Sequence, residues 1–474
     1  MSSSQSPLLP DATRALARFA AETPVRDIPP DVLERVKLSF LDGLGVCLRG
    51  TTFPWTRMVG DIIQQEGGNP VASLWGTGRR TSLTNAVLFN STAGHAFEMD
   101  DIHKESIIHP NSLAVPVVLA LAEADPSLSG RDIVGALALS YEVGLRIGNA
   151  ATMSLFLNGF HPQGTSGAFV AAVAAGRLLR LDATQMQHAL GIAGSMGAGL
   201  MAAQEGAMVK RLHAGRAAQS GMLAALLAKR GFTGITDIVE ASYGGFLSSF
   251  SRTPNPGRLM EGLGEDWEAG KIGFKMYPNV TSIHAALDGL RSILVEEGVT
   301  AAQIEEIRVG CGHMTFVHTA WEYRPAGITA AQMNMGYGLS VMARRRNVSA
   351  GDYTDDAIAD PETLAFMPRI KIAVDPEIES RGPPFRHAAR IAVQTTDGRS
   401  LTREVWHRRG SPENPVSRQE VEEKFVASVN QLLGANDAER LKSLAAGLDV
   451  VANAGEIVEI VASPFAQALS RDAS

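Results

Sequence analysis

The chain has 474 residues, which is more than one ordinary hydrophobic core supports, so two lobes are expected. Hydrophobic residues make up 45% and charged residues 20%, a composition that excludes a disordered chain. Lys and Arg number 43 against 50 Asp and Glu, and the net charge of -7 argues against nucleic acid as the main partner, because neutralising phosphates needs a basic surface.

The cysteine count and the hydropathy pattern exclude further classes of protein. Cys47 and Cys311 are the only cysteines, which excludes a disulfide framework and a four-thiolate metal site and favours the reducing cytoplasm. No stretch offers about 18 uninterrupted apolar residues, so no membrane span is predicted. The N-terminal segment lacks a basic start followed by an apolar block, so no secretory signal is expected.

The first lobe is predicted to be helical over about 270 residues, because apolar residues recur at three- and four-residue spacing. Asp182 is a plausible N-cap, with Gln185 three residues further on. The Gly-rich run 191–200 is typical of closely packed helices. The predicted helices are Ala12–Glu22, Asp31–Leu48, Ser112–Ala124, Gly130–Ala151, Gly167–Leu179, Asp182–Ala203 and Ala214–Arg230.

After residue 270 the pattern changes to a mixture of strands and helices. Asp397-Gly398 between two alternating segments predicts a hairpin. Helical spacing returns from Ser417 onward. We therefore predict a mainly α fold with an inserted α+β lobe: 1–270 and 408–474 form an all-helical domain, and 271–407 form the α+β domain. The predicted elements after residue 270 are strands Ile304–Val309, Arg369–Val374, Ala388–Gln394 and Ser400–Trp406 and helices His284–Glu297 and Thr329–Ala343.

Titratable side chains are dense within Ala93–Pro116. Carboxylates and imidazoles this close can hold different proton states, as acid/base chemistry requires, or can bind a divalent metal. The alternative is a polar loop with helix caps, and a surface position is expected for His103. The candidates are His95, Glu98, Asp100, Asp101, His103 and His109.

A second candidate site lies in Asn158–Phe169, where His161-Pro162 precedes an Ala-rich helix. Hydroxyls and free N–H groups at a helix start can bind an anion, and a His beside them can act as an acid or base. An ordinary capped helix with an incidental His is the alternative.

A third candidate consists of Lys210, His213 and Arg216, which are spaced three residues apart. On a helix they would share one face and suit a substrate with several carboxylates. The alternative is an ordinary basic helix surface.

A fourth candidate lies at the expected lobe junction, where clefts form. Lys275 and Tyr277 precede Pro278, and His284 opens the next helix. The alternative is a hinge with a helix cap. Weaker candidates are Gln332, Asn334 and Tyr337 on a neighbouring helix, and weaker still are His313, His318 and Tyr323.

In this order and spacing, the motifs resemble those of the MmgE/PrpD superfamily over nearly the whole chain. That superfamily includes 2-methylcitrate dehydratase, cis-aconitate decarboxylase and iminodisuccinate epimerase. The matching segments are Asp31–Arg49, His95–Glu123, Gly159–Gly176, Lys210–Gly221, Lys275–Leu290 and Arg409–Phe425.

The resemblance implies a large helical domain built from both chain ends, a smaller α+β lid and a homodimer. It implies no cofactor. No metal is predicted, since no standard zinc spacing appears, although Glu98, Asp101 and His109 leave a metal conceivable. A small polycarboxylate would lie in the cleft between helical domain and lid. The decarboxylase branch carries a His shortly after the position of Pro278, where this chain has Asn279 and Val280, and this difference argues against decarboxylation.

The chemistry of the family explains the residue types, because its reactions pass through a carbanion-like state beside a carboxylate. His109 and His161 are the expected proton-transfer pair, and Asp101 would orient a His or bond a substrate hydroxyl. Lys210 would stabilise the developing charge. The remaining expected substrate-binding residues are Glu98, Lys275, His213, Arg216, Tyr277 and His284.

The first functional hypothesis is a lyase that eliminates water from a hydroxylated di- or tricarboxylate, as 2-methylcitrate dehydratase does. An epimerase or isomerase of a dicarboxylate, or a decarboxylase, is the alternative. A third hypothesis is a non-catalytic binding protein on the same scaffold.

Overall fold

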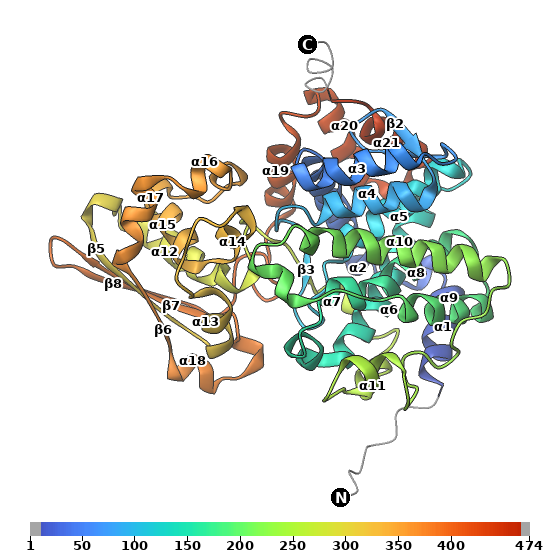
Figure 1. The fold of residues 1–474 in the computed structure, drawn as a ribbon, viewed down its shortest axis with the longest axis horizontal. Coiled ribbons are helices and arrows are strands. Elements are labelled where there is room, and N and C mark those ends of the chain that lie inside the picture. The colour runs from blue at the N-terminus through green and yellow to red at the C-terminus, as the bar shows by residue number, and fades with distance from the viewer. Residues whose placement is uncertain (1–10, 466–474) are drawn as a thin grey trace, which may run out of the picture.

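The computed structural model describes residues 11–465, and these residues are mainly helical with a small mixed sheet. Figure 1 shows a larger helical part that carries both ends of the chain and a smaller part that contains the sheet. The prediction about a secretory signal concerned the N-terminal segment, and residues 1–10 of that segment lie outside the described residues. Within the described range, no helix combines the length and the apolar character needed to cross a bilayer.

The larger part begins with helices that the apolar spacing predicts well. Ala12–Glu22 is reproduced, and Pro30 occupies the first turn of its helix, where the missing N–H costs nothing. Asp182 caps its helix through the predicted capping box with Gln185. The helices of this part are α1 Ala12–Glu22, α2 Pro30–Gly50, α3 Pro54–Glu66, α4 Leu83–Gly94, α5 Pro110–Ala124, α6 Gly130–Leu157, α7 Pro162–Thr165, α8 Gly167–Leu178, α9 Ala183–Ser195, α10 Val209–Lys229, α11 Phe246–Phe250, α19 Arg418–Val429, α20 Ala435–Ala446 and α21 Gly455–Ala462.

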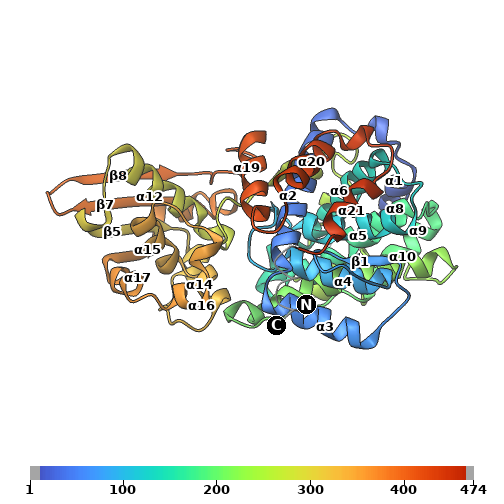
Figure 2. The ribbon, with the colours of Figure 1, turned by 90° about the horizontal axis from the view of Figure 1, so that it is seen from above.

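One hydrophobic core joins the two ends of the chain in this part. Phe40 from α2 and Phe425 from α19 belong to the same buried cluster, as does Ile457 from α21. Figure 2 shows α19, α20 and α21 lying along the helices of the N-terminal segment. The C-terminal helices therefore complete a core that the first 270 residues begin.

Two expectations for the larger part were wrong. The helix predicted over Asp182–Ala203 ends at Ser195. The chain then passes through Gly199, whose φ of 138° is incompatible with a continued helix, and resumes as a 3-10 helix at Met201–Glu205. The part is also not entirely helical. It contains strands of two or three residues, too short for an alternating pattern to reveal them: β1 Ala72–Leu74, β2 Arg79–Thr81, β3 Ile102–His103 and β4 Ile272–Gly273.

The smaller part is built on a four-stranded mixed sheet in the order β6-β5-β7-β8. β5 pairs in parallel with β6 and antiparallel with β7, and β7 pairs antiparallel with β8. The predicted hairpin at Asp397-Gly398 joins β7 and β8, with Gly398 at a φ of 87°. The strands are β5 Ile304–Cys311, β6 Ile370–Val374, β7 Ala389–Thr395 and β8 Ser400–Val405.

A second hydrophobic core lies between this sheet and the helix α12, which packs on β7 and β8. The helix predicted over Thr329–Ala343 is broken at Asn334, whose side chain accepts a hydrogen bond from the backbone N–H of Tyr337 and caps the second half. The helices of this part are α12 His284–Glu296, α13 His313–Thr319, α14 Ile328–Met333, α15 Met335–Arg345, α16 Asp355–Ile358, α17 Pro361–Phe366 and α18 Pro376–Ser380.

Candidate active site

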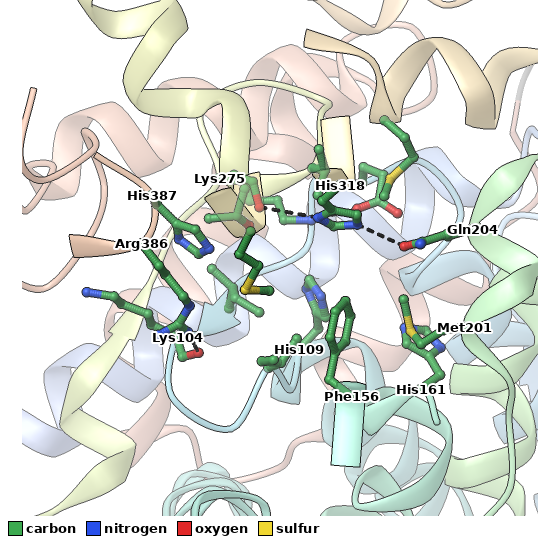
Figure 3. A pocket seen from close by; sticks show the side chains of 18 of the residues that line it. Lys104, His109, Phe156, His161, Met201, Gln204, Lys275, His318, Arg386 and His387 are labelled. Atoms are coloured by element: carbon green, nitrogen blue, oxygen red, sulfur yellow. Dashed lines mark hydrogen bonds and ion pairs between the residues drawn. The ribbon is translucent and has the colours of Figure 1, made fainter. Parts of the chain in front are cut away.

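A narrow cavity of about 70 Å³ lies where the two parts meet, and Figure 3 shows it from close by. His109, His161 and Lys210 reach it from the larger part, and Lys275 reaches it from the segment that leads into the smaller part. All four side chains are at least nine-tenths buried. Four segments that are far apart in the sequence therefore place their basic groups around one enclosed space.

The two histidines occupy equivalent local positions. Each precedes a proline that starts a helix, His109 before Pro110 of α5 and His161 before Pro162 of α7. A residue before proline is kept out of the helical conformation, so each His ends an extended segment at the helix entry. The sequence pattern His-Pro thus places each imidazole at the cavity rather than within a helix face.

The carboxylate of Glu98 lies among three basic side chains at one end of the cavity. Lys210 Nζ and Arg211 Nη1 both donate to Glu98 Oε1, the latter at 2.6 Å. Lys275 Nζ donates to Glu98 Oε2 at 2.9 Å. Positive groups therefore outnumber this carboxylate, and the surplus charge favours binding of an anion.

Burial and the neighbouring charges set the protonation states of this cluster. Burial alone would raise the pKa of Glu98, but Lys210, Lys275 and Arg211 outweigh it and hold that pKa well below its usual value. Burial lowers the pKa of Lys210 to about 8, against the opposing attraction of Glu98. Lys210 is therefore a cation at neutral pH but a more acidic one than an exposed lysine.

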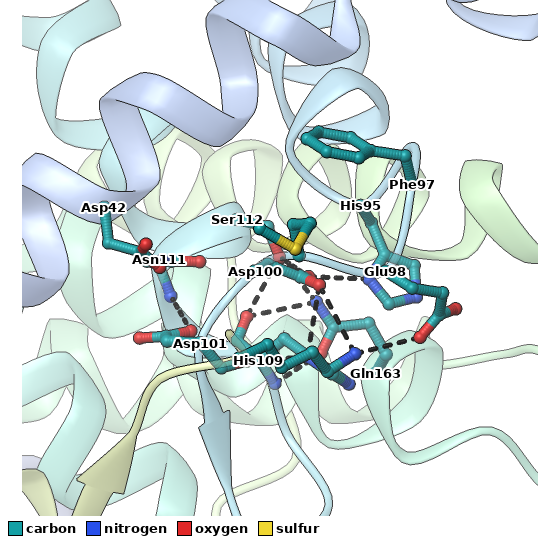
Figure 4. Close-up of polar contacts among 12 residues, drawn as sticks. Asp42, His95, Phe97, Glu98, Asp100, Asp101, His109, Asn111, Ser112 and Gln163 are labelled. Carbon is teal, nitrogen blue, oxygen red and sulfur yellow. Dashed lines mark hydrogen bonds and ion pairs between the residues drawn. The ribbon is translucent and has the colours of Figure 1, made fainter. Parts of the chain in front are cut away.

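Asp100 connects two of the imidazoles, as Figure 4 shows. Its Oδ2 accepts from His95 Nδ1 at 2.7 Å and from Ser112 Oγ at 2.9 Å, and its Oδ1 lies 3.3 Å from His109 Nδ1. Burial would raise the pKa of Asp100, but the attraction of His109 and His95 outweighs it and holds that pKa well below its usual value. Asp100 is therefore an ionised, fully buried partner for both rings.

The tautomer of His109 follows from its partners. Its Nδ1 lies 2.6 Å from the carbonyl oxygen of Asp101, and a carbonyl can only accept, so Nδ1 carries the hydrogen. In the neutral ring Nε2 then has a free lone pair. Gln163 fixes the backbone of His109 by accepting from its N–H at 2.8 Å and donating to its carbonyl at 3.1 Å. His109 is thus held as a potential base.

His161 is paired with a second imidazole. Its Nδ1 lies 2.9 Å from Nδ1 of His213, so one ring donates and the other accepts, and both cannot be cations. Burial, reinforced by Lys210, lowers the pKa of His161 well below its usual value and that of His213 to about 4. Both rings are neutral at pH 7, and His213 orients His161 from behind the cavity wall.

Asp101 faces away from the cavity. Its side chain accepts from Ser39 Oγ at 2.6 Å and from the backbone N–H of Asn111 at 3.1 Å, inside the larger part. Burial, only partly offset by these bonds, raises its pKa well above the usual value. The carbonyl of Asp101, rather than its carboxylate, orients His109.

The best-placed metal-ligating groups are those of His95, Asp100 and His109, whose ligand atoms lie within 4.8 Å of one another. A metal ion there would use imidazole and carboxylate ligands, a common combination. His95 Nδ1 and His109 Nδ1 are already hydrogen-bonded, whereas His95 Nε2 and Asp100 Oδ1 have no hydrogen-bond partner among the described residues.

The scan against family models matches both parts of the chain. The MmgE/PrpD N-terminal domain matches residues 14–258, and the MmgE/PrpD C-terminal domain matches residues 277–450. The chain belongs to the MmgE/PrpD family. These two matches cover most of the helical part and the sheet-containing part, and they agree with the resemblance seen in the motifs.

Curated MmgE/PrpD relatives align with the chain over nearly its full length. A cis-aconitate decarboxylase of Aspergillus terreus is 30% identical, with 95% of this chain and 96% of the relative covered. The cis-aconitate decarboxylase-like protein oryM of Aspergillus oryzae is 28% identical over 95% and 97% of the two chains. The cis-aconitate decarboxylase of Homo sapiens is 26% identical, with 96% of each covered.

Several side chains expected at the site do not line the cavity of this MmgE/PrpD chain. Arg216 is exposed and hydrogen-bonded to Gln219. Each three-residue step on a helix turns about 60° short of a full circle, so Arg216, six residues after Lys210, points about 120° away from it. Tyr277 donates to Asp288 in the second core, and His284 bonds to the carbonyl of Asn279.

His103 also differs from expectation. It is 1% exposed rather than at the surface, because β3 pairs with β4 and brings His103 Nε2 to 3.0 Å from Glu268.

Some groups on the cavity wall of this MmgE/PrpD chain, or directly behind it, were not singled out by the sequence. Arg211 does not line the cavity but pairs with Glu98, which does. Arg386 and His387 enter from the smaller part, as Figure 3 shows, and they follow a Pro-Pro pair with no chemical pattern around them. One signal in the sequence could have identified Arg211: it lies in a helix that is expected to be buried, where a cation without a partner would be costly.

Proposed function

We propose that this protein is a cofactor-independent lyase that decarboxylates a small unsaturated polycarboxylate of the cis-aconitate class. The observation that carries the proposal is the convergence of His109, His161, Lys210 and Lys275 on one buried cavity. Names given to full-length relatives at 26–30% identity support the choice of reaction.

The two lysines bind the substrate and stabilise the charge that develops on it. Loss of CO2 breaks a carbon–carboxylate bond, and the electron pair moves through the adjacent double bond toward a second carboxylate. Lys210 and Lys275 face the space where that carboxylate would lie, and their positions are already fixed by Glu98. Such preorganised cations favour the transition state over the ground state.

A proton completes the reaction at carbon. The carbanion-like intermediate takes one proton from an acid in the cavity, and the acid recovers it from solvent. Lys210 can supply it because its pKa is lowered to about 8. His109 and His161 line the same cavity and can relay it. The chain therefore contains every group that the step needs.

Elimination of water is the second candidate, since neutral His161 can act as the base that such a reaction requires. The difference at Asn279 and Val280 does not decide against decarboxylation. Val280 lines the cavity, but the four basic side chains that converge on it, named above, are all present despite this difference. The homodimer and the cytoplasmic location stay predictions.

The reaction can be identified by NMR in heavy water with a panel of citrate-, aconitate- and malate-like acids. Decarboxylation should release CO2 and place one deuterium on the product. A rising ultraviolet enoate signal without CO2 would indicate a dehydratase, and exchange with inversion an epimerase. Binding without any change would reveal a non-catalytic protein.

The role of His161 can be tested with His161→Ala. We expect turnover to fall at least about a hundredfold, the usual contribution of a positioned acid or base, while the circular dichroism spectrum stays unchanged. His407→Ala, which changes a part-exposed histidine outside the cavity, is the control. Unaltered turnover in His161→Ala would remove His161 from the mechanism.

A further inference from the structure

A second, larger hollow of about 630 Å³ adjoins the catalytic cavity. Its wall is mostly apolar and comes from both parts of the chain: Met153 and Leu157 at the end of α6, Val317 in α13, and Ile378 in α18. Leu157 is 71% exposed and Val317 63% exposed, so large apolar side chains lie open to solvent here. An exposed apolar groove of this kind marks a binding surface.

The groove and the catalytic cavity share part of their walls. Phe156, Gln204, Met314, His318 and Arg386 line both. At this junction His318 Nε2 lies 2.8 Å from Gln204 Oε1, and the rings of Phe156 and His318 meet edge to face at 5.8 Å, as Figure 3 shows. A ligand in the cavity can therefore extend into the groove between these side chains.

The groove wall owes its position to a strained residue. Thr152 interrupts α6 with φ 59° and ψ -177°, a conformation that a β-branched residue rarely adopts. Its hydroxyl donates to the carbonyl of Thr253 at 3.0 Å and accepts from the N–H of Ser154, which holds the break in place. Met153, Phe156 and Leu157 all follow this break.

We infer that the substrate carries an alkyl chain on its polycarboxylate head, with the head among the lysines and the chain in this groove. The identity of the head group rests on the proposed function. The occupant follows from the shared wall of the two spaces: a charged cavity for carboxylates lies directly beside an apolar one, and five side chains line both. A small acid alone would leave the groove empty.

Binding of stable probes tests the inference independently of turnover. Succinate, methylsuccinate, butylsuccinate and octylsuccinate share a dicarboxylate head and differ in chain length. Calorimetry should show Kd falling by roughly fourfold for each methylene that the groove buries. Equal Kd values for succinate and octylsuccinate would overturn the inference. Absence of turnover with every acid would instead refute the proposed function and leave these Kd values to decide the groove.

Variants in the groove test where the alkyl chain of the ligand lies. Leu157→Asp and Val317→Asp should each weaken octylsuccinate binding at least about tenfold and leave succinate binding unchanged, since both side chains lie outside the catalytic cavity. Val295→Asp, at an equally open apolar position of α12, should change neither. An equal loss for both probes, or no loss for either, would contradict the assignment.

A second copy of the chain is the competing occupant. Light scattering on Val317→Asp distinguishes it. An unchanged mass together with weakened octylsuccinate binding supports the inference. A dimer that dissociates while octylsuccinate binding persists would show that the groove is an interface and would overturn it.

Discussion

Glu98 organises the basic residues around the cavity. It has a φ of 60°, a left-handed conformation that is costly for a residue with a side chain, and its carboxylate meets three cations. Without it, Lys210 and Lys275 would repel one another in a buried space. Glu98 therefore holds both lysines in place before any substrate binds.

The lowered pKa of Lys210 predicts the alkaline limit of activity. Lys210 binds a carboxylate only when protonated, and its charged fraction falls as the pH rises through about 8. We therefore expect kcat/KM to decline above pH 8. In Lys210→Arg the maximal rate should fall, because a guanidinium is a poor proton donor. The alkaline limit of the remaining activity should move upward by more than one pH unit, because the guanidinium stays charged.

The pH profile of kcat/KM checks this prediction, with Lys229→Arg on the same helix as the control. An alkaline limb near pH 8 that persists in Lys210→Arg would assign the ionisation to another group.

At the scale of elements, close packing of α10 on α4 sets the distance between Lys210 and Glu98. Gly215 lies in α10, and a Cβ at that position would come within 2.1 Å of Thr92 Oγ1 and 2.5 Å of the carbonyl oxygen of Leu88. α4 ends at Gly94, shortly before Glu98. The small residues that the sequence shows in these helices therefore serve the site as well as the core.

Gly215→Ala should force α10 away from α4. We expect a loss of about 1–3 kcal/mol in the free energy of unfolding, as for other overpacked positions, together with weaker substrate binding. Urea denaturation measures the first effect. Gly351→Ala is the matched control, because its Cβ would meet nothing closer than 3.7 Å. Equal stability of the two variants would show that α10 has room to move.

At the scale of the whole molecule, a helix near the end of the chain supports the segment 95–103, which carries Glu98 and Asp100. Lys424 of α19 forms a buried ion pair with Asp42 of α2 at 2.6 Å and donates to the carbonyl of Met99 at 2.6 Å. Met99 is the neighbour of both Glu98 and Asp100. The segment after the sheet-containing part thus returns to fix the backbone that carries the carboxylates.

Lys424→Met should leave Asp42 buried without its partner and cost about 3–5 kcal/mol of unfolding free energy. Turnover should fall as well, since the segment 95–103, which carries Glu98 and Asp100, loses its support. Urea denaturation and the NMR assay measure the two effects. Lys442→Met removes only more exposed pairs and should cost less than about 1 kcal/mol. Full stability of Lys424→Met would refute the supporting role.

The sequence alone determined most helices, the hairpin at Asp397-Gly398 and the family, because apolar spacing, caps and turn residues act over a few neighbours. It also identified His109, His161, Lys210 and Lys275, whose residue types stand out in Ala- and Gly-rich surroundings. The tertiary structure alone decided that these four meet, that Arg216 does not join them, that Arg386 does, and that Arg211 pairs with Glu98 behind the cavity wall. Side-chain direction and contacts between distant segments depend on how helices rotate and pack, and local sequence does not encode that rotation.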